Sequence, residues 1–212
     1  ISTAAMSVGQ QRSAMADEKK SEVVKRGIAE LRLRSSQMDK LGRFYGETLG
    51  LPTTMEADSL VVTAGQTLIR FAPASTNEND GPFYHFSFNI PENKLELGRA
   101  WQKKRTPLVK RGNPEVIHFS RWNAHSVFFN DPAGNILEYI AQHDLKNSAP
   151  GAFTTKDILY ASEIGLVVDD VGSTVTAAKD SLGIGVYRDK AEFFASLGDE
   201  HALLMLVKRN RL

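Results

Sequence analysis

The chain contains no cysteine among its 212 residues. This absence excludes disulfides, zinc sites built on thiolates and cysteine nucleophiles, so a bound metal would need His, Asp or Glu ligands. It does not decide the cellular compartment. A cytoplasmic location is favoured, and export stays open.

Long apolar runs and an excess of one charge are also missing. No stretch reaches the roughly 20 apolar residues that span a bilayer, so we expect a soluble protein without a membrane partner. Twenty-six basic residues against twenty-five acidic ones give a net charge of +1, which provides no field for binding nucleic acid. With 42% hydrophobic residues, the chain can bury a globular core and bind a small-molecule ligand or substrate.

Three segments of the chain share one pattern, in which an alternating strand precedes a helix and further short strands. The pattern predicts helices over 37–48, 91–105 and 173–181. The first strands are expected at 29–34, 84–89 and 162–167, and the second residue of each is ionisable: Glu30, His85 and Glu163. The recurrence indicates that this strand position has a common role.

The closing strands of the three segments also align. Residues 64–71 align with 133–140 without a gap, which puts Ile69 at the equivalent of Glu138. The corresponding strand of the third segment, 202–207, is entirely apolar. Only the second segment therefore carries a possible metal ligand in its closing strand.

Each segment is interpreted as a βαβββ module, and the fold class as α+β. A module of about 50 residues leaves one sheet face bare and should pair with another. We expect modules 27–75 and 82–146 to pair within 27–146 as curled mixed sheets around a cleft. A linker, 147–157, would lead to a third module, 158–212, whose lack of a partner favours a homodimer.

The N-terminal extension, residues 1–26, leaves two interpretations open. Residues 13–26 could form a helix of mixed charge that docks through its few apolar side chains. The alternative is a solvated lead-in without regular structure.

Residues 27–142 resemble the vicinal oxygen chelate superfamily of glyoxalases, fosfomycin-resistance and bleomycin-binding proteins and extradiol dioxygenases. The segment 128–138, Phe-Phe-Asn-Asp-Pro-Ala-Gly-Asn-Ile-Leu-Glu, is similar to the family's final hairpin, whose closing glutamate binds metal. His85 stands at the ligand position of the second-module strand. Glu30 stands where the family usually has His or Gln, so the resemblance implies a metal triad of Glu30, His85 and Glu138.

Two carboxylates and one imidazole suit Mn(II), Fe(II), Zn(II) or Ni(II) and leave positions open for substrate. Such a metal could chelate two neighbouring oxygens of a substrate and stabilise the charge that develops there. An alternative without metal is a buried hydrogen-bonded pair of His85 and Glu138. No separate organic cofactor site is indicated.

Further candidate residues each have two interpretations. Arg32 and Arg34 share a strand face with Glu30 and could bind an anionic substrate, or they could pair with nearby acids. His125 could act as a general base in the cleft or tether a loop. Glu163 is interpreted as a partner-facing or exposed carboxylate, because its own module offers no second ligand.

These residues support three hypotheses for function. The first is a metal-dependent enzyme of lyase, isomerase, transferase or dioxygenase type. The second is a non-catalytic, bleomycin-resistance-like protein that encloses a small apolar ligand with an aromatic rim of Phe71, Phe83, Trp101 and Phe129. The third is an interaction protein whose third module is the working surface.

Overall fold

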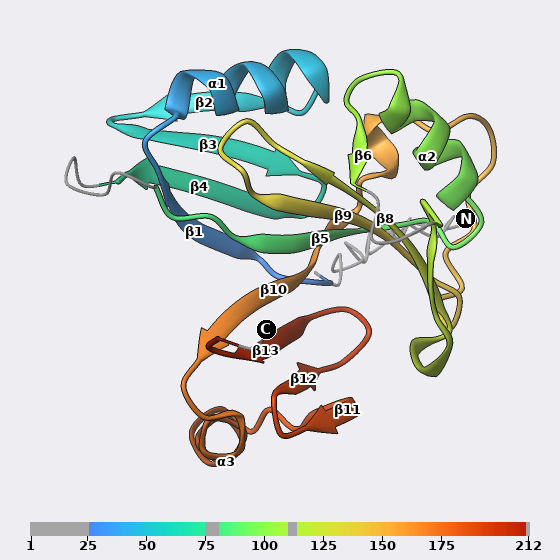
Figure 1. Cartoon of the computed structure of the whole chain (residues 1–212). Helices are drawn as coiled ribbons and strands as arrows, with labels where there is room; N and C mark the ends of the chain where they lie inside the picture. Colours follow the sequence, from blue (N-terminus) through green and yellow to red (C-terminus); the bar gives the residue numbers. More distant parts are fainter. Residues whose placement is uncertain (1–25, 75–80, 110–113, 211–212) are drawn as a thin grey trace, which may run out of the picture.

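The computed structural model describes residues 26–74, 81–109 and 114–210. The expected helix over 13–26 lies almost entirely outside the described residues. Within them the chain is an α+β protein built from three βαβββ modules (Figure 1), which confirms the expected fold class. None of the described helices is long and apolar enough to cross a membrane.

The first module is a small mixed sheet with one helical segment packed on it. Its strands lie in the order β1-β4-β3-β2, and β1 runs parallel to β4. The helix predicted over 37–48 forms as α1, which continues into the π-helical turn η1. The elements are β1 (Glu30–Ser35), α1 (Met38–Arg43), η1 (Phe44–Thr48), β2 (Thr53–Glu56), β3 (Ser59–Ala64) and β4 (Thr67–Pro73).

The second module repeats this plan with a shorter helix than predicted, because Pro91, Glu92 and Asn93 precede the helix instead of opening it. Its first strand β5 runs parallel to its last strand β9. The elements are β5 (His85–Ile90), α2 (Leu95–Lys103), β6 (Leu108–Val109), β7 (Ile117–Phe119), the 3-10 turn η2 (Ser120–Trp122), β8 (Ala124–Asn130) and β9 (Ile136–Gln142).

The third module follows the short 3-10 turn η3 (Thr155–Asp157) and again pairs its first and last strands in parallel. Its helix begins at the side chain of Asp170, which accepts a hydrogen bond from the main chain of Ser173, and ends at Gly183 with φ of 68°. The elements are β10 (Tyr160–Val168), α3 (Val171–Leu182), β11 (Val186–Ala191), β12 (Phe194–Gly198) and β13 (Leu203–Lys208).

The second and third modules share one continuous sheet of order β11-β12-β13-β10-β5-β9-β8-β6, with β7 attached to β8. The first strands β5 and β10 join them in antiparallel register. The expectation that the modules 27–75 and 82–146 pair around the cleft and leave 158–212 alone is therefore wrong. It is β1 whose second edge lacks a strand neighbour in the described chain.

The different positions of β5, inside its sheet, and β1, at the edge of its sheet, have a physical cause. β5 carries Phe86 and Phe88 and is buried on both faces, as a strand in the middle of a sheet must be. β1 alternates buried leucines with the charged residues Glu30, Arg32 and Arg34. Charges of this kind keep a strand at a sheet edge.

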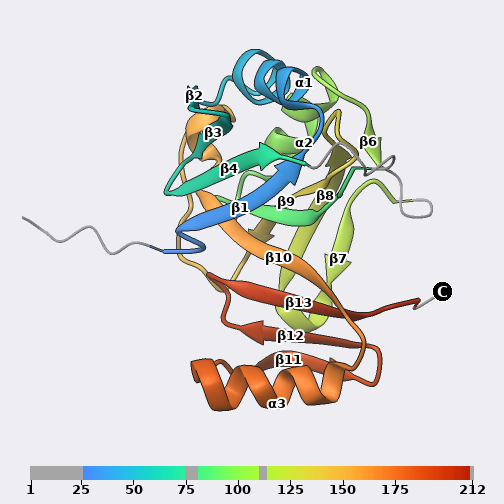
Figure 2. The same ribbon diagram turned by 90° about the vertical axis from the view of Figure 1, so that its left-hand side faces the viewer.

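The main core lies between the sheet of the first module and the second module. Leu31 and Leu33 of β1 share one hydrophobic cluster with Phe86 and Phe88 of β5. Figure 2 shows the first module stacked over the second in this way, with β10 and β13 below. Because strand residues alternate between faces, the residues of β5 between these phenylalanines point to the opposite side.

A buried ion pair fastens the segment that joins the second and third modules. Lys94 Nζ lies 2.7 Å from Asp157 Oδ1 and donates a second bond to the main-chain oxygen of Ala152. The other oxygen of Asp157 accepts from the main chain of Thr154, at the start of η3. Lys94 is only 2% exposed, so each charge depends on the other.

We predict that Lys94→Met lowers the free energy of unfolding by about 3 kcal/mol, because Asp157 would remain buried without its counter-charge. Denaturant unfolding followed by circular dichroism measures the change. Lys40→Met is the matched control, since Lys40 is exposed and its amine donates to the side chain of Gln37 in an exposed contact, and it should cost less than about 0.5 kcal/mol. Equal effects of the two substitutions would contradict the role assigned to the pair.

Candidate metal centre and cleft

One cluster of metal-competent side chains appears in the described chain, on three adjacent strands. It consists of His85 on β5, Glu138 on β9 and Glu163 on β10, whose ligand atoms all lie within 4.8 Å of one another. The register places Ser87 between the two glutamates, opposite Glu138 on one side and Glu163 on the other. The register of β10 against β5 shifts at a bulge between Ala161 and Glu163. Bulges often occur beside functional sites.

The imidazole of His85 is oriented by a main-chain contact. Its Nδ1 lies 3.2 Å from the carbonyl oxygen of Ile136, and its Nε2 lies 3.4 Å from Glu138 Oε2. Because a carbonyl oxygen only accepts, Nδ1 carries a hydrogen, and Nε2 is the ring nitrogen that faces the glutamates. This is the arrangement of a metal-binding histidine held by an outer partner.

A turn of five residues sets the distance between His85 and Glu138. The side chain of Asp131 accepts bonds from the main chains of Ala133 and Asn135 and from the amide of Asn135. Asn135 in turn accepts from the main-chain nitrogen of Tyr84, directly before His85. The start of β9 is thereby tied to the start of β5.

The two glutamates of the cluster are buried close together. Glu138 is 2% exposed and Glu163 1% exposed. Burial, and then the negative charge of Glu138, raise the pKa of Glu163 well above its ordinary value, against a smaller opposite effect of a hydrogen bond from Ser87. Oε1 of Glu163 has no hydrogen-bond partner in the described chain. A divalent cation fits this donor set, because it would neutralise both charges and occupy the unpartnered oxygen.

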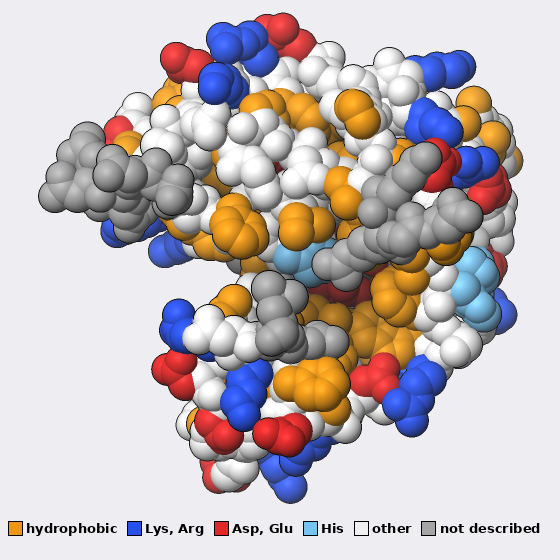
Figure 3. Space-filling model, in the orientation of Figure 1, with side chains coloured by type: hydrophobic (Ala, Val, Ile, Leu, Met, Phe, Trp, Pro, Cys, Tyr) orange, Lys and Arg blue, Asp and Glu red, His pale blue; other side chains and the backbone are white. Residues whose placement is uncertain are grey.

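The cluster lies at the bottom of a cleft of about 700 Å³ between the second and third modules. Figure 3 shows the opening, with apolar side chains along its wall and acidic atoms in its depth. At the rim, Asp189 accepts bonds from Arg121 and from the indole nitrogen of Trp122. The apolar wall residues include Phe83, Phe119, Trp122, Phe128, Met205 and Val207.

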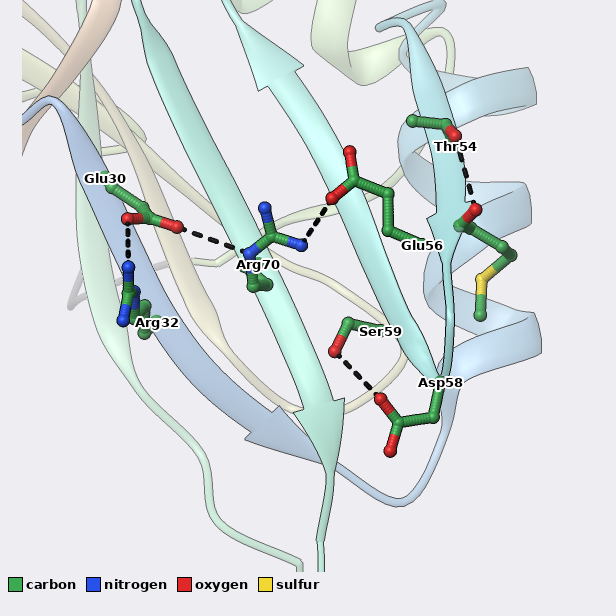
Figure 4. Close-up of polar contacts among 8 residues, drawn as sticks. Glu30, Arg32, Thr54, Glu56, Asp58, Ser59 and Arg70 are labelled. Carbon is green, nitrogen blue, oxygen red and sulfur yellow. Dashed lines mark hydrogen bonds and ion pairs between the residues drawn. The ribbon is translucent and has the colours of Figure 1, made fainter.

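Glu30 does not lie with His85 and Glu138, contrary to its predicted place in the triad. It belongs to the other sheet, where it accepts bonds from Arg32 Nη2 at 3.0 Å and from Arg70 Nε at 3.3 Å (Figure 4). These bonds, the one from Arg32 first, lower the pKa of Glu30. Arg70 also reaches Glu56 at 2.8 Å. Glu30 is thus part of an ion-pair network.

Arg32 and Arg34 are not among the residues that line the cleft. The Arg32 side chain is 79% exposed and pairs with Glu30. Arg34 is exposed as well, and its main-chain nitrogen donates to the hydroxyl of Tyr84. The ion-pair interpretation of Arg32 agrees with the geometry, and a contact of either residue with a substrate in this cleft does not.

The structure also corrects the alignment of the closing strands. In the second module Glu138 lies two residues along from the partner of His85, since His85 pairs with Ile136. In the first module Glu30 pairs with Leu68, so the residue at the place of Glu138 is Arg70. Ile69 faces the core and is fully buried. A slip of one residue moves a side chain to the other face of a strand.

His125 lies away from the cleft, packed against two other histidines. Its ring stacks on His118 with centroids 4.3 Å apart, and its Nδ1 lies 2.8 Å from His143 Nε2. Burial, and then the two neighbouring rings, lower the pKa of His125. Phe128 on the same strand lines the cleft, and because it follows His125 by three residues, an odd separation, His125 lies on the opposite face.

Only part of the aromatic rim predicted from the sequence lines the cleft. Phe83 is among the lining residues, whereas Phe71 and Phe129 are fully buried in the core. Trp101 packs against Phe153 and under Arg105. The residue that sequence reasoning undervalued is Glu163, although its position in the aligned first strands was a usable signal.

The family model of the Glyoxalase/Bleomycin resistance protein/Dioxygenase superfamily matches residues 27–139, more than half of the chain. The chain belongs to this superfamily. The match includes His85 and Glu138 and ends before Glu163. The assignment of a third module to this superfamily member therefore depends on its structure alone.

Solved structures with the same fold include glyoxalase I from Zea mays, as a V278E mutant, with 17% identity and a TM-score of 0.57. That alignment covers 88% of this chain and 69% of the maize chain. A putative dioxygenase from Bacillus subtilis subsp. subtilis str. 168 has 18% identity, a TM-score of 0.61 and coverage of 86% and 64%. These likenesses concern the fold, and this superfamily member spans about two thirds of each relative. No curated protein matches the chain significantly.

We predict that Glu163→Gln stabilises the metal-free protein at pH 8 by about 1 kcal/mol, as expected when a site keeps a costly charge for its function. Because the pKa of Glu163 is raised above 4.5, the folded state holds this proton more tightly than the unfolded chain. Stability of the parent protein should therefore fall as the pH rises through the interval between the two pKa values.

Denaturant unfolding with a chelator present, repeated across this pH range, measures the difference between the proteins. It should vanish at low pH, where Glu163 is neutral in both states. Glu192→Gln is the control, because Glu192 is 87% exposed. A variant less stable than the parent at pH 8 would show that the Glu163 charge is compensated within the protein.

Proposed function

We propose that this protein is a metal-dependent enzyme of its superfamily, with a divalent transition metal bound by His85, Glu138 and Glu163. The observation that carries the proposal is the pair of buried glutamates beside an imidazole whose Nε2 faces them. Two adjacent buried carboxylates are costly without a cation. One oxygen of Glu163 also lacks any partner in the described chain.

Two carboxylate ligands and one imidazole ligand suit Mn(II), Fe(II), Zn(II) or Ni(II). In the third module Met205 lies opposite Gly165, at the place that Glu138 takes in the second module, so a fourth carboxylate is missing there. Three protein ligands leave coordination positions open. When bound, the metal would polarise two adjacent substrate oxygens and stabilise negative charge that develops on them.

The residues of the cleft define the rest of the proposed substrate. A volume of about 700 Å³ with mainly apolar walls suits a small molecule whose oxygens reach the metal and whose remainder is apolar. The ring of Phe128 stacks against that of His85, with the two centroids 6.0 Å apart. We propose lyase, isomerase, transferase or dioxygenase chemistry on such a substrate.

The aromatic walls also favour a second candidate, a non-catalytic protein that encloses a small apolar ligand as bleomycin-resistance-like proteins do. In that case the cleft would bind its ligand equally well without metal. Titration of an apolar fluorescent probe into chelator-treated and metal-loaded protein separates the two functions. Binding that depends on metal supports the enzyme, and binding indifferent to metal supports the second candidate.

We predict that the purified protein binds about one transition metal ion per chain. His85→Ala, Glu138→Ala and Glu163→Ala should each weaken binding by about 100-fold or more, since each removes a ligand. Titration with Mn(II), Fe(II), Zn(II) and Ni(II), followed by elemental analysis, measures both quantities. Protein that stays metal-free with all four ions would refute the proposal.

Glu30→Ala is the control variant that separates the sequence-based triad from the observed cluster. Glu30 contacts Arg32 and Arg70 and lies in the other sheet, so its removal should leave metal affinity unchanged within about twofold. Like Glu163→Ala, this variant removes one carboxylate. A large loss of affinity in Glu30→Ala would restore Glu30 as a ligand and displace Glu163.

A further inference from the structure

The buried polar side-chain atoms that lack a hydrogen-bond partner within the described chain are gathered in one part of the molecule. They belong to Asn89, Ser126, Gln142, Glu163 and Tyr187. Neither the nitrogen nor the oxygen of the Asn89 amide is paired, and the same holds for Gln142. Buried polar groups almost always have a partner, so each exception needs an explanation. A metal would explain Glu163, which leaves four uncharged side chains.

The strand register puts three of these side chains on the face of the sheet that carries the metal cluster. Asn89 lies opposite Ile140 on β9, and Ile140 lies opposite Ser126 on β8. Directly opposite residues share a face, and so do residues two apart in one strand. Ile140 follows Glu138 by two residues, and Gln142 follows Ile140 by two. The three polar residues therefore continue the floor of the cleft beyond Glu138, beginning about 7 Å from it.

The third module covers this floor with Tyr187 of β11. Tyr187 packs against the hydrophobic cluster that contains Ile140 and Ala124, and Ala124 lies opposite Gln142. The buried, unpaired hydroxyl of Tyr187 thus belongs to the same region. Trp122 is a member of that cluster and also lines the cleft, so it borders both. We call Tyr187 and the three polar floor residues the inner polar region.

We propose that the inner polar region binds an uncharged hydrogen-bonding group, such as a carboxamide, of a ligand whose apolar body lies in the cleft. Two amides and two hydroxyls offer both donors and acceptors to such a group. None of the four carries a charge, and Glu138 lies in the adjacent row, so burial of an anionic group there would be costly. The proposal shares with the proposed function the use of the cleft as the ligand site, and it requires no metal.

A ligand group reaches this region when the side chains that cover it shift. The register of β11 against β12 is interrupted between Val186 and Lys190, and Tyr187 lies inside the interruption. No regular strand ladder therefore fixes its position. The indole nitrogen of Trp122 donates to Asp189, two residues after Tyr187, so the two covering side chains are coupled through one short segment of β11.

Fluorescence titration of the chelator-treated full chain tests the proposal with three probes of similar shape: 2-naphthamide, 2-isopropylnaphthalene and 2-naphthoate. Gln142→Met and Tyr187→Phe remove polar atoms with little change of shape, and the loss of an unpaired group should not prevent folding. Each variant should weaken the binding of 2-naphthamide by about tenfold, since the ligand amide loses one hydrogen bond. The affinities for the other two probes should stay within about twofold.

Gln102→Met is the matched control, because it removes a buried amide that is already hydrogen-bonded, to Tyr139 and Thr106. It should leave the affinities for all three probes within about twofold. Circular dichroism identifies any variant that fails to fold. A crystal structure with 2-naphthamide gives a check that needs no variant, since its amide should lie within hydrogen-bond distance of Gln142 or Tyr187.

Several results would overturn the proposal. They are the failure of 2-naphthamide to bind the parent protein, an equal loss for all three probes, and a crystal structure with the amide elsewhere. Unchanged affinity for 2-naphthamide in both variants would show that the region holds water only. Because the protein in the titration is free of metal, either this proposal or the proposed metal site can fail while the other stands.

Discussion

The antiparallel pairing of β5 with β10 is the constraint on which the site depends. It joins the second and third modules in one sheet, and it places Glu163 across from Ser87 and beside Glu138. Without this pairing, His85 and Glu138 would be two polar residues of a single module. Together they would supply only one carboxylate, and no second cleft wall would face them. The cleft and the third candidate ligand therefore have the same structural origin.

The pairing of β5 with β10 holds Glu138 and Glu163 in a buried environment that disfavours their charges. The surrounding contacts keep the two carboxylates in place. The turn built on Asp131 and Asn135 fixes the start of both β5 and β9. The Lys94–Asp157 pair fastens the chain on its way to β10. Buried, unfavourable arrangements persist when neighbouring contacts determine them, and they are concentrated at functional sites. The first module resolves the same position differently, with Arg70 paired to Glu30.

Much of this architecture could be predicted from the sequence. The repeated pattern of strand, helix and strands located three modules, and the segment from Phe128 to Glu138 identified the closing hairpin and one candidate ligand. His85 followed from its place in an apolar strand. These features depend on the local alternation of apolar and polar residues and on turn residues, both of which can be read directly from the sequence.

The choice of module partners could not be predicted in this way, because pairing depends on contacts between distant strands. Any two of the three first strands could have been joined, and the wrong choice led to Glu30 instead of Glu163. A second error arose at the hairpins, where two residues separate β3 from β4 and five separate β8 from β9. An alignment without a gap across turns of different length put Ile69 where the strands place Arg70.

The central claim is that a metal binds where the second and third modules meet. Anomalous diffraction from crystals grown with Mn(II) tests it most directly, because the peak reports the position of the ion. The account predicts one strong peak at about 2.0 to 2.2 Å from ligand atoms of His85, Glu138 and Glu163. A peak beside Glu30, or no peak at the cluster in the presence of saturating Mn(II), would contradict it.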